Sequence, residues 1–67
     1  MNNWVRVREN QAWGALHWAK EHCPTYITND AEVEKINGED YIYYYRFYFQ
    51  TNTQGRLEQT AFALRWA

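Results

Sequence analysis

The chain has 67 residues, a formal net charge of −1 and a single cysteine, Cys23. A domain of this length buries only about 60% of the surface that its unfolded chain exposes, so it needs a covalent staple, a partner or a dense apolar set. The lone cysteine excludes an internal disulfide and argues against a zinc site. The near-neutral charge argues against a protein that mainly grips phosphates.

Aromatic residues can supply the dense apolar set that a chain of this length needs for a stable core. The chain carries four Trp, six Tyr and three Phe, and each aromatic side chain removes roughly 150–250 Å² from water when it is covered. A core of this size cannot hide all of them, and exposed aromatic patches mark interfaces. We therefore expect part of the aromatic set to lie on the surface.

No targeting or membrane segment is predicted. The N-terminal sequence MNNW lacks the order of a signal peptide, in which a basic stretch precedes an apolar one. No apolar run approaches the ~20 residues that span a bilayer, and an unpaired cysteine is typical of a reducing compartment. We expect one domain, residues 1–67, in the cytoplasm and without a membrane partner.

Apolar and polar side chains alternate over residues 3–8, which is typical of a β-strand with one solvent-exposed face. One side carries Val5 and Val7, and the other carries Trp4, Arg6 and Arg8. The spacing becomes helical from Glu9 to Cys23. Its apolar stripe, flanked by Trp13 and Trp18, consists of small or aliphatic residues: Ala12, Ala15, Leu16, Ala19 and Cys23.

Pro24 ends this helix, because the residue before a proline is pushed out of the helical region. Residues 24–30 are ambiguous between irregular chain and the start of a strand. Residues 31–36 alternate again, and Asn37-Gly38 is a strong hairpin signal. We expect a three-residue loop, Asn37 to Glu39, with Gly38 in a left-handed conformation. This loop pairs Val33 with Tyr43 and Ala31 with Tyr45, and keeps Glu32 and Glu34 outside.

The stretch from Tyr41 to Phe49, YIYYYRFYF, predicts the central strand. Aromatic residues and isoleucine suit a strand that neighbours cover, whereas the same strand at a sheet edge would invite aggregation. Arg46 belongs on the solvent side, so Ile42, Tyr44 and Tyr48 share that side. The residues expected to face the core are then Tyr41, Tyr43, Tyr45, Phe47 and Phe49.

Residues 56–67, RLEQTAFALRWA, allow two interpretations. Alternation of Phe62, Leu64 and Trp66 suits a fourth strand. Helix propensity, N-cap candidates at residues 51–53 and a stripe of Leu57, Ala61 and Leu64 favour a helix. We predict the helix and keep the strand over residues 56–66, a β-α-β-β-β order, as the alternative.

The predicted order, β-α-β-β-α, is a small α+β fold of the split β-α-β kind, ferredoxin-like but lacking the last strand. A right-handed crossover makes the first two strands parallel, and the third fills the gap antiparallel to both. Both helices then cover one side of the three-stranded sheet. We name the uncovered side the open face. Its expected residues are Trp4, Arg6, Arg8, Ile42, Tyr44, Arg46 and Tyr48.

The open face allows three readings. Its rings and arginines can simply support cross-strand pairs. Trp, Tyr and Arg are also the residues that carry binding energy at protein interfaces, which favours a protein partner, a second copy of the chain included. Single-stranded RNA or DNA could stack on Trp4, Tyr44 and Tyr48. However, the basic and glycine positions of the RNA-recognition motif are absent from residues 43–49, and Glu32 and Glu34 would repel phosphate.

We expect no enzyme and no catalytic, metal or cofactor residues. The residues that could serve as a nucleophile, a base or a metal ligand are His17, His22 and Cys23, and their positions argue against each role. A five-residue spacing places the two histidines on different sides of the helix. Cys23 follows the helix C-terminus, whereas reactive thiolates are favoured at helix N-termini.

The segments HCPTYITN and RFYFQTNTQGRLEQTAFALRWA resemble short uncharacterised accessory proteins of tailed phages, over about half the chain. Those proteins often close on an aromatic strand, a turn and an amphipathic segment ending in LRW. The resemblance brings no known activity, cofactor or functional residue. It implies stoichiometric binding to a host or viral protein, in the host cytoplasm.

Overall fold

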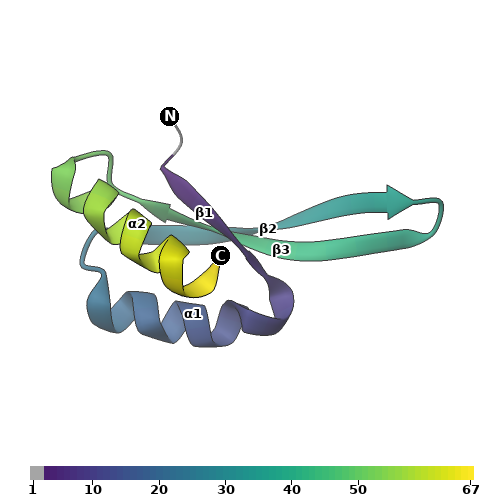
Figure 1. Ribbon diagram of the computed structural model, residues 1–67, viewed down its shortest axis with the longest axis horizontal. Coiled ribbons are helices and arrows are strands. Elements are labelled where there is room, and N and C mark those ends of the chain that lie inside the picture. The colour runs from purple at the N-terminus through teal and green to yellow at the C-terminus, as the bar shows by residue number, and fades with distance from the viewer. Residues whose placement is uncertain (1–2) are drawn as a thin grey trace.

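The computed structural model describes residues 3–67. The elements are β1 (Trp4–Arg8), α1 (Glu9–His22), β2 (Tyr26–Asn37), β3 (Asp40–Phe49) and α2 (Thr53–Trp66). The sheet order is β1-β3-β2, with β3 antiparallel to both neighbours (Figure 1). The predicted split β-α-β fold is confirmed. The alternative with a fourth strand over residues 56–66 is wrong.

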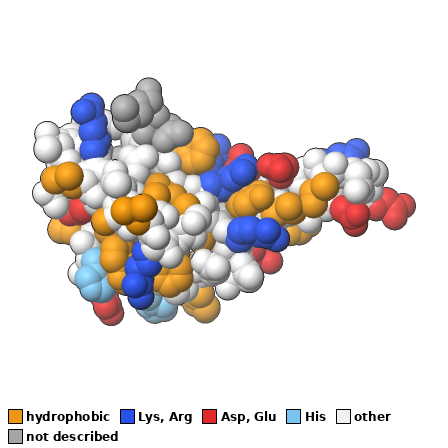
Figure 2. All heavy atoms as spheres, viewed as in Figure 1, with side chains coloured by type: hydrophobic (Ala, Val, Ile, Leu, Met, Phe, Trp, Pro, Cys, Tyr) orange, Lys and Arg blue, Asp and Glu red, His pale blue; other side chains and the backbone are white. Residues whose placement is uncertain are grey.

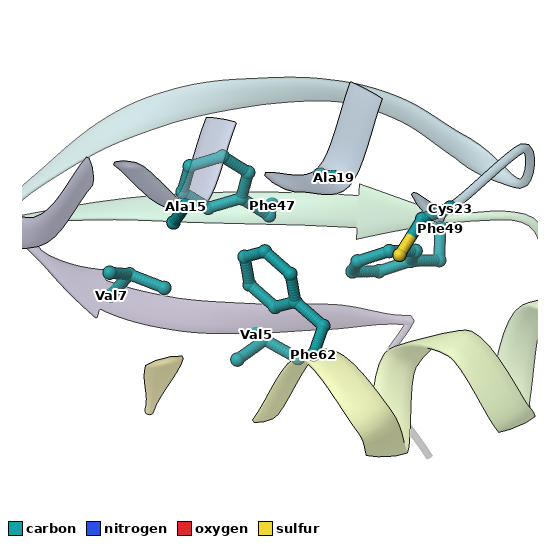
Figure 3. Close-up of a cluster of buried hydrophobic side chains, with 8 residues drawn as sticks. All are labelled: Val5, Val7, Ala15, Ala19, Cys23, Phe47, Phe49 and Phe62. Atoms are coloured by element: carbon teal, nitrogen blue, oxygen red, sulfur yellow. The ribbon is translucent and has the colours of Figure 1, made fainter. Parts of the chain in front are cut away.

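The core lies between the sheet and the two helices. β1 and β3 contribute alternate side chains, the alanines of α1 let that helix approach closely, and α2 inserts Phe62 between the rings of Phe47 and Phe49, with centroids 5.0 and 5.3 Å away. The ambiguous residues 26–30 join β2, and α1 ends at His22 as Pro24 requires. The buried apolar set is Val5, Val7, Ala15, Ala19, Cys23, Phe47, Phe49 and Phe62 (Figure 3).

The helix predicted at the C-terminus is present, but its predicted apolar stripe is on the wrong side. Leu57 and Leu64 are 62% and 85% exposed, and Phe62 is buried instead. The start of the helix sets this rotation. Asn52 caps it by accepting a hydrogen bond from the Gly55 N–H at 2.7 Å, and Gly55 is buried against the backbone of Gln50. Periodicity alone does not include these contacts.

A buried carboxylate ties α2 to the segment between α1 and β2. Oε1 of Glu58 accepts hydrogen bonds from the N–H of Thr25 at 2.9 Å and from the Thr25 hydroxyl. Its Oε2 accepts one from Nε2 of Gln54 at 2.6 Å. Burial by itself would raise the pKa of Glu58, but the hydrogen bonds from Gln54 and Thr25 together outweigh it and lower the pKa below its ordinary 4.5.

This arrangement predicts a loss of stability in acid. A carboxyl whose pKa is lower in the folded chain stabilises the fold above its unfolded pKa, and the contribution disappears as pH falls through the folded value. The difference in unfolding free energy between the wild type and Glu58→Gln should therefore be largest near pH 7, about 2 kcal/mol, and should shrink as the pH falls below the ordinary pKa of the carboxyl. Urea titrations at several pH values measure it. A difference that does not change with pH would contradict the charged role of Glu58.

The β2–β3 hairpin projects beyond the helices as an arm, residues 33–43, and gives the molecule its 41 × 25 × 19 Å extents (Figure 1). The prediction that Tyr41 and Tyr43 face the core is wrong, because neither side chain is buried. Both point to the helix side of the sheet, but they lie past the end of the helix layer and stay 49% and 50% exposed. Tyr45, Phe47 and Phe49 do pack in or against the core.

The hairpin register is as predicted, but its loop is not. Val33 pairs with Tyr43 and Ala31 with Tyr45. The turn contains only two residues, Gly38 and Glu39, and an irregularity of β2 between Lys35 and Asn37 absorbs the extra residue. No glycine of the described chain has a positive φ, so the left-handed Gly38 is also wrong.

The described residues contain no helix that is long and apolar enough to cross a membrane.

Candidate functional site

The open face forms as the sequence predicts, on the side of the sheet opposite the helices. Alternation in β1 and β3 places the valines, the phenylalanines and the odd-numbered tyrosines of β3 on the helix side, and turns the even-numbered side chains to the opposite side. The register places Trp4 opposite Tyr48 and Arg6 opposite Arg46. All seven predicted residues are partly or fully exposed: Trp4, Arg6, Arg8, Ile42, Tyr44, Arg46 and Tyr48.

Arg46 is held by a carboxylate on the neighbouring strand. Its Nε and Nη2 donate to Oδ1 and Oδ2 of Asp30 at 2.9 and 3.1 Å, and the Tyr48 hydroxyl donates to the same Oδ2 at 3.1 Å. A two-point arginine–carboxylate pair fixes orientation as well as charge. The hydrogen bond to Asp30 raises the pKa of Arg46. Partial burial, and then the bond to Asp30, raise the pKa of Tyr48, so both groups keep their protons at neutral pH.

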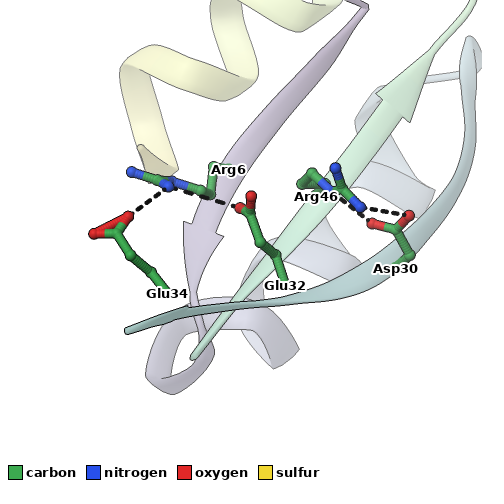
Figure 4. Close-up of polar contacts among 5 residues, drawn as sticks. All are labelled: Arg6, Asp30, Glu32, Glu34 and Arg46. Carbon is green, nitrogen blue, oxygen red and sulfur yellow. Dashed lines mark hydrogen bonds and ion pairs between the residues drawn. The ribbon is translucent and has the colours of Figure 1, made fainter. Parts of the chain in front are cut away.

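Arg6 crosses the face from β1 to β2. Its Nη1 lies 3.1 Å from Oε2 of Glu34 and 3.7 Å from Oε1 of Glu32 (Figure 4). On the way its guanidinium covers the ring of Tyr44, 4.0 Å from the centroid. The predicted outward position of both glutamates is confirmed. Across the central strand, Glu34 accepts a hydrogen bond from Arg6, and Glu32 forms an ion pair with it.

Sequence reasoning missed Asp30, which lies in the segment left ambiguous. Its spacing of two residues from Glu32, and of four from Glu34, is the signal that could have placed all three carboxylates on one side of a longer strand. Arg8 and Ile42 also lie on the open face. Among the described residues, Arg8 forms none of the ion pairs of this face.

The result is a nearly neutral, ordered surface. Its three arginines, at positions 6, 8 and 46, stand beside the three acidic side chains of residues 30, 32 and 34. Rings lie among the paired charges: the guanidinium of Arg46 is 5.7 Å from the ring centroid of Trp4 and 6.0 Å from that of Tyr48. Exposed ion pairs of this kind contribute little stability. Their main effect is to hold long side chains in defined positions.

The residues considered for catalysis have structural surroundings. Cys23 is buried, and burial followed by the nearby charge of Glu58 raises the pKa of its thiol, which favours the protonated form over the nucleophilic thiolate. His22 stacks on Trp18 with ring centroids 4.7 Å apart, and its Nδ1 lies 3.0 Å from the Trp18 carbonyl. Within residues 3–67, no three His, Cys, Asp or Glu side chains come together as possible metal ligands. The absence of enzymatic activity stays a prediction.

Comparison with known proteins does not add a family to this geometry. No protein-family model, curated protein or solved structure matches the chain.

Proposed function

We propose that the chain is a small non-enzymatic binding module that attaches to a protein partner through its open face. The observation that supports this most directly is the pairing of Arg6 and Arg46 with acidic side chains of β2, which holds both arginines among the rings before any partner arrives. Ordering long side chains on binding costs about 0.5–1.5 kcal/mol each, and part of that cost is already met within the sheet.

The chemistry of the face suits a protein more than a phosphate backbone. Interface hot spots are enriched in Trp, Tyr and Arg, and these three residue types make up six of the seven residues of the open face: Trp4, Arg6, Arg8, Tyr44, Arg46 and Tyr48. A nucleic acid would have to displace Asp30 from Arg46 and Glu34 from Arg6. A folded partner can instead match alternating positive and negative groups with its own.

The biological setting of the proposal comes from the sequence resemblance to phage accessory proteins. It makes the partner a host or viral protein, bound stoichiometrically in the cytoplasm. Binding of this kind can inhibit the partner or scaffold it.

The test uses the purified chain as bait in host lysate, treated with nuclease or left untreated, with captured proteins identified by mass spectrometry. We expect one protein to be retained by the wild type and by Leu64→Ala, which changes an exposed residue of α2, and to be lost with Tyr44→Ala and Arg46→Ala. Recovery of that protein by all four baits would overturn the proposal. Direct titration with the purified partner should then give a dissociation constant at least about tenfold weaker for Arg46→Ala, because truncating a hot-spot residue costs about 2 kcal/mol or more and each ~1.4 kcal/mol is tenfold.

Single-stranded nucleic acid is the second candidate, because Trp4 lies directly opposite Tyr48 on the adjacent strand, in the layout on which bases stack. Titration with single-stranded RNA and DNA oligonucleotides separates the two functions. Phosphate-driven binding weakens linearly in log–log form between about 50 and 200 mM salt, whereas an aromatic protein contact changes little. Tight, salt-sensitive oligonucleotide binding that Tyr44→Ala abolishes would favour this candidate over the first.

A further inference from the structure

The helix side of the hairpin arm carries an apolar surface that no element of the described chain covers. Val33, Tyr41 and Tyr43 point to this side and are about half exposed. A two-stranded hairpin is marginally stable without a covering layer, and apolar side chains on such an arm favour burial against another surface. In Figure 2 the arm leaves the body of the molecule, with hydrophobic side chains along its neck and acidic side chains gathered at its tip.

A groove on the same side of the molecule continues from the base of the arm. It has a volume of about 540 Å³ and lies between the first half of α1 and the sheet. Trp13 stands on its rim, 73% exposed, although it belongs to the helix that covers the core. Among the described residues its lining is mainly apolar or amide: Glu9, Asn10, Ala12, Trp13, Leu16, Asn29 and Tyr45.

The charges of the two features are complementary. Glu9 is the charged residue of the groove, and Lys35, opposite Tyr41, is the charged residue on the helix side of the arm before the turn. Neither forms an ion pair within the described part of the chain. A projecting arm with a lysine and a groove with a glutamate on one molecule meet the requirement of a two-fold contact, in which each copy offers both halves.

We infer that this surface joins two copies of the chain, with the arm of each copy lying across the α1 groove of the other. Tyr41 and Tyr43 then pack beside the second copy's tryptophan at position 13, and Lys35 meets the second copy's glutamate at position 9. From their exposed fractions, Trp13, Tyr41 and Tyr43 present roughly 350 Å² of aromatic surface. That is a large share of the ~800 Å² that each partner contributes to a stable interface, and the backbone and smaller side chains of arm and groove surround it. The opposite side of the sheet remains free for the proposed partner.

Sedimentation of the full chain from about 1 to 200 μM tests the inference. We expect a concentration-dependent dimer. Tyr43→Asp should weaken it at least tenfold, because it places a charge in an apolar contact. Glu9→Lys and Lys35→Glu should each weaken dimerisation, and the double variant should recover most of it. Circular dichroism checks that each variant is folded. If Tyr43→Asp fails to fold, recovery of the dimer in the Glu9→Lys, Lys35→Glu double variant still decides the test.

Two control variants identify other contacts. Leu64→Asp alters the exposed stripe of α2, and Arg46→Ala alters the open face, so both should leave the dimer intact. A monomer at every concentration overturns the inference, as does a dimer that persists in Tyr43→Asp. A dimer lost with Leu64→Asp or with Arg46→Ala overturns it too, because the contact would then use α2 or the open face. Partner capture by the open face is measured separately, so either proposal can fail without the other.

Discussion

Phe62→Ala is expected to unfold most of the protein at 25 °C. Phe62 is fully buried, and its ring contacts Phe47, Phe49 and Trp18 from the only helix position of α2 that reaches the centre of the described core. Truncating a buried phenylalanine costs about 3–5 kcal/mol. A core in a chain of this size supplies about the same amount in total. Urea unfolding followed by far-ultraviolet circular dichroism should show a variant that is largely unfolded without denaturant.

Leu64→Ala is the matched control, two residues along the same helix. Leu64 is 85% exposed, so its truncation should change the unfolding free energy by less than about 0.5 kcal/mol. The sequence pattern alone, with its stripe of Leu57, Ala61 and Leu64, predicts the opposite order of effects. Equal losses in the two variants would mean that α2 is rotated relative to the structure described above.

Gly55→Ala should destabilise the protein by about 3 kcal/mol, the upper part of the usual range for overpacking. In an exposed helix the same change is favourable by about 1 kcal/mol, so the sign is the informative part. A β-carbon at Gly55 would overlap the carbonyl oxygen of Gln50 and lie 2.8 Å from its carbonyl carbon. That carbonyl cannot move away freely, because the Gln50 N–H donates to the Thr25 carbonyl at 2.9 Å and Phe49 is buried beside it.

Gly38→Ala provides the comparison, because the same substitution there meets open space. No heavy atom lies within 4 Å of a β-carbon built at Gly38, and its φ is not positive. Alanine restricts the unfolded chain more than glycine, so this variant should be neutral or more stable by up to about 1 kcal/mol. Thermal and urea unfolding of both variants measure the contrast. Destabilisation by Gly38→Ala, or none by Gly55→Ala, would contradict the backbone geometry at that glycine.

Much of the fold follows from local patterns that tertiary contacts do not change. Alternation in residues 3–8 and 41–49 assigns every side chain of β1 and β3 to one side of the sheet. The charge of Arg46 then decides which side meets solvent. The same argument correctly places Glu32 and Glu34 outside. The order of elements and the right-handed crossover place the aromatic strand in the centre.

The tertiary structure decided three things that periodicity does not contain. It set the rotation of α2, because the packing of Gly55 on Gln50 and the bonds of Glu58 to Thr25 turn Phe62 inward and leave Leu64 outside. It set where the helix layer stops, so that Tyr41 and Tyr43 are exposed although they share a side with Phe47.

The third is the choice of partner for each charged side chain on the open face. A strand pattern states which side a charge lies on, but the partner of that charge is chosen by the register between strands. Arg46 meets Asp30 directly opposite, and Arg6 reaches Glu34 across the central strand. The sequence by itself therefore determined the sides of the sheet. Contacts between residues distant in the chain determined which groups on those sides are free, because rotation, register and coverage depend on packing that no local repeat encodes.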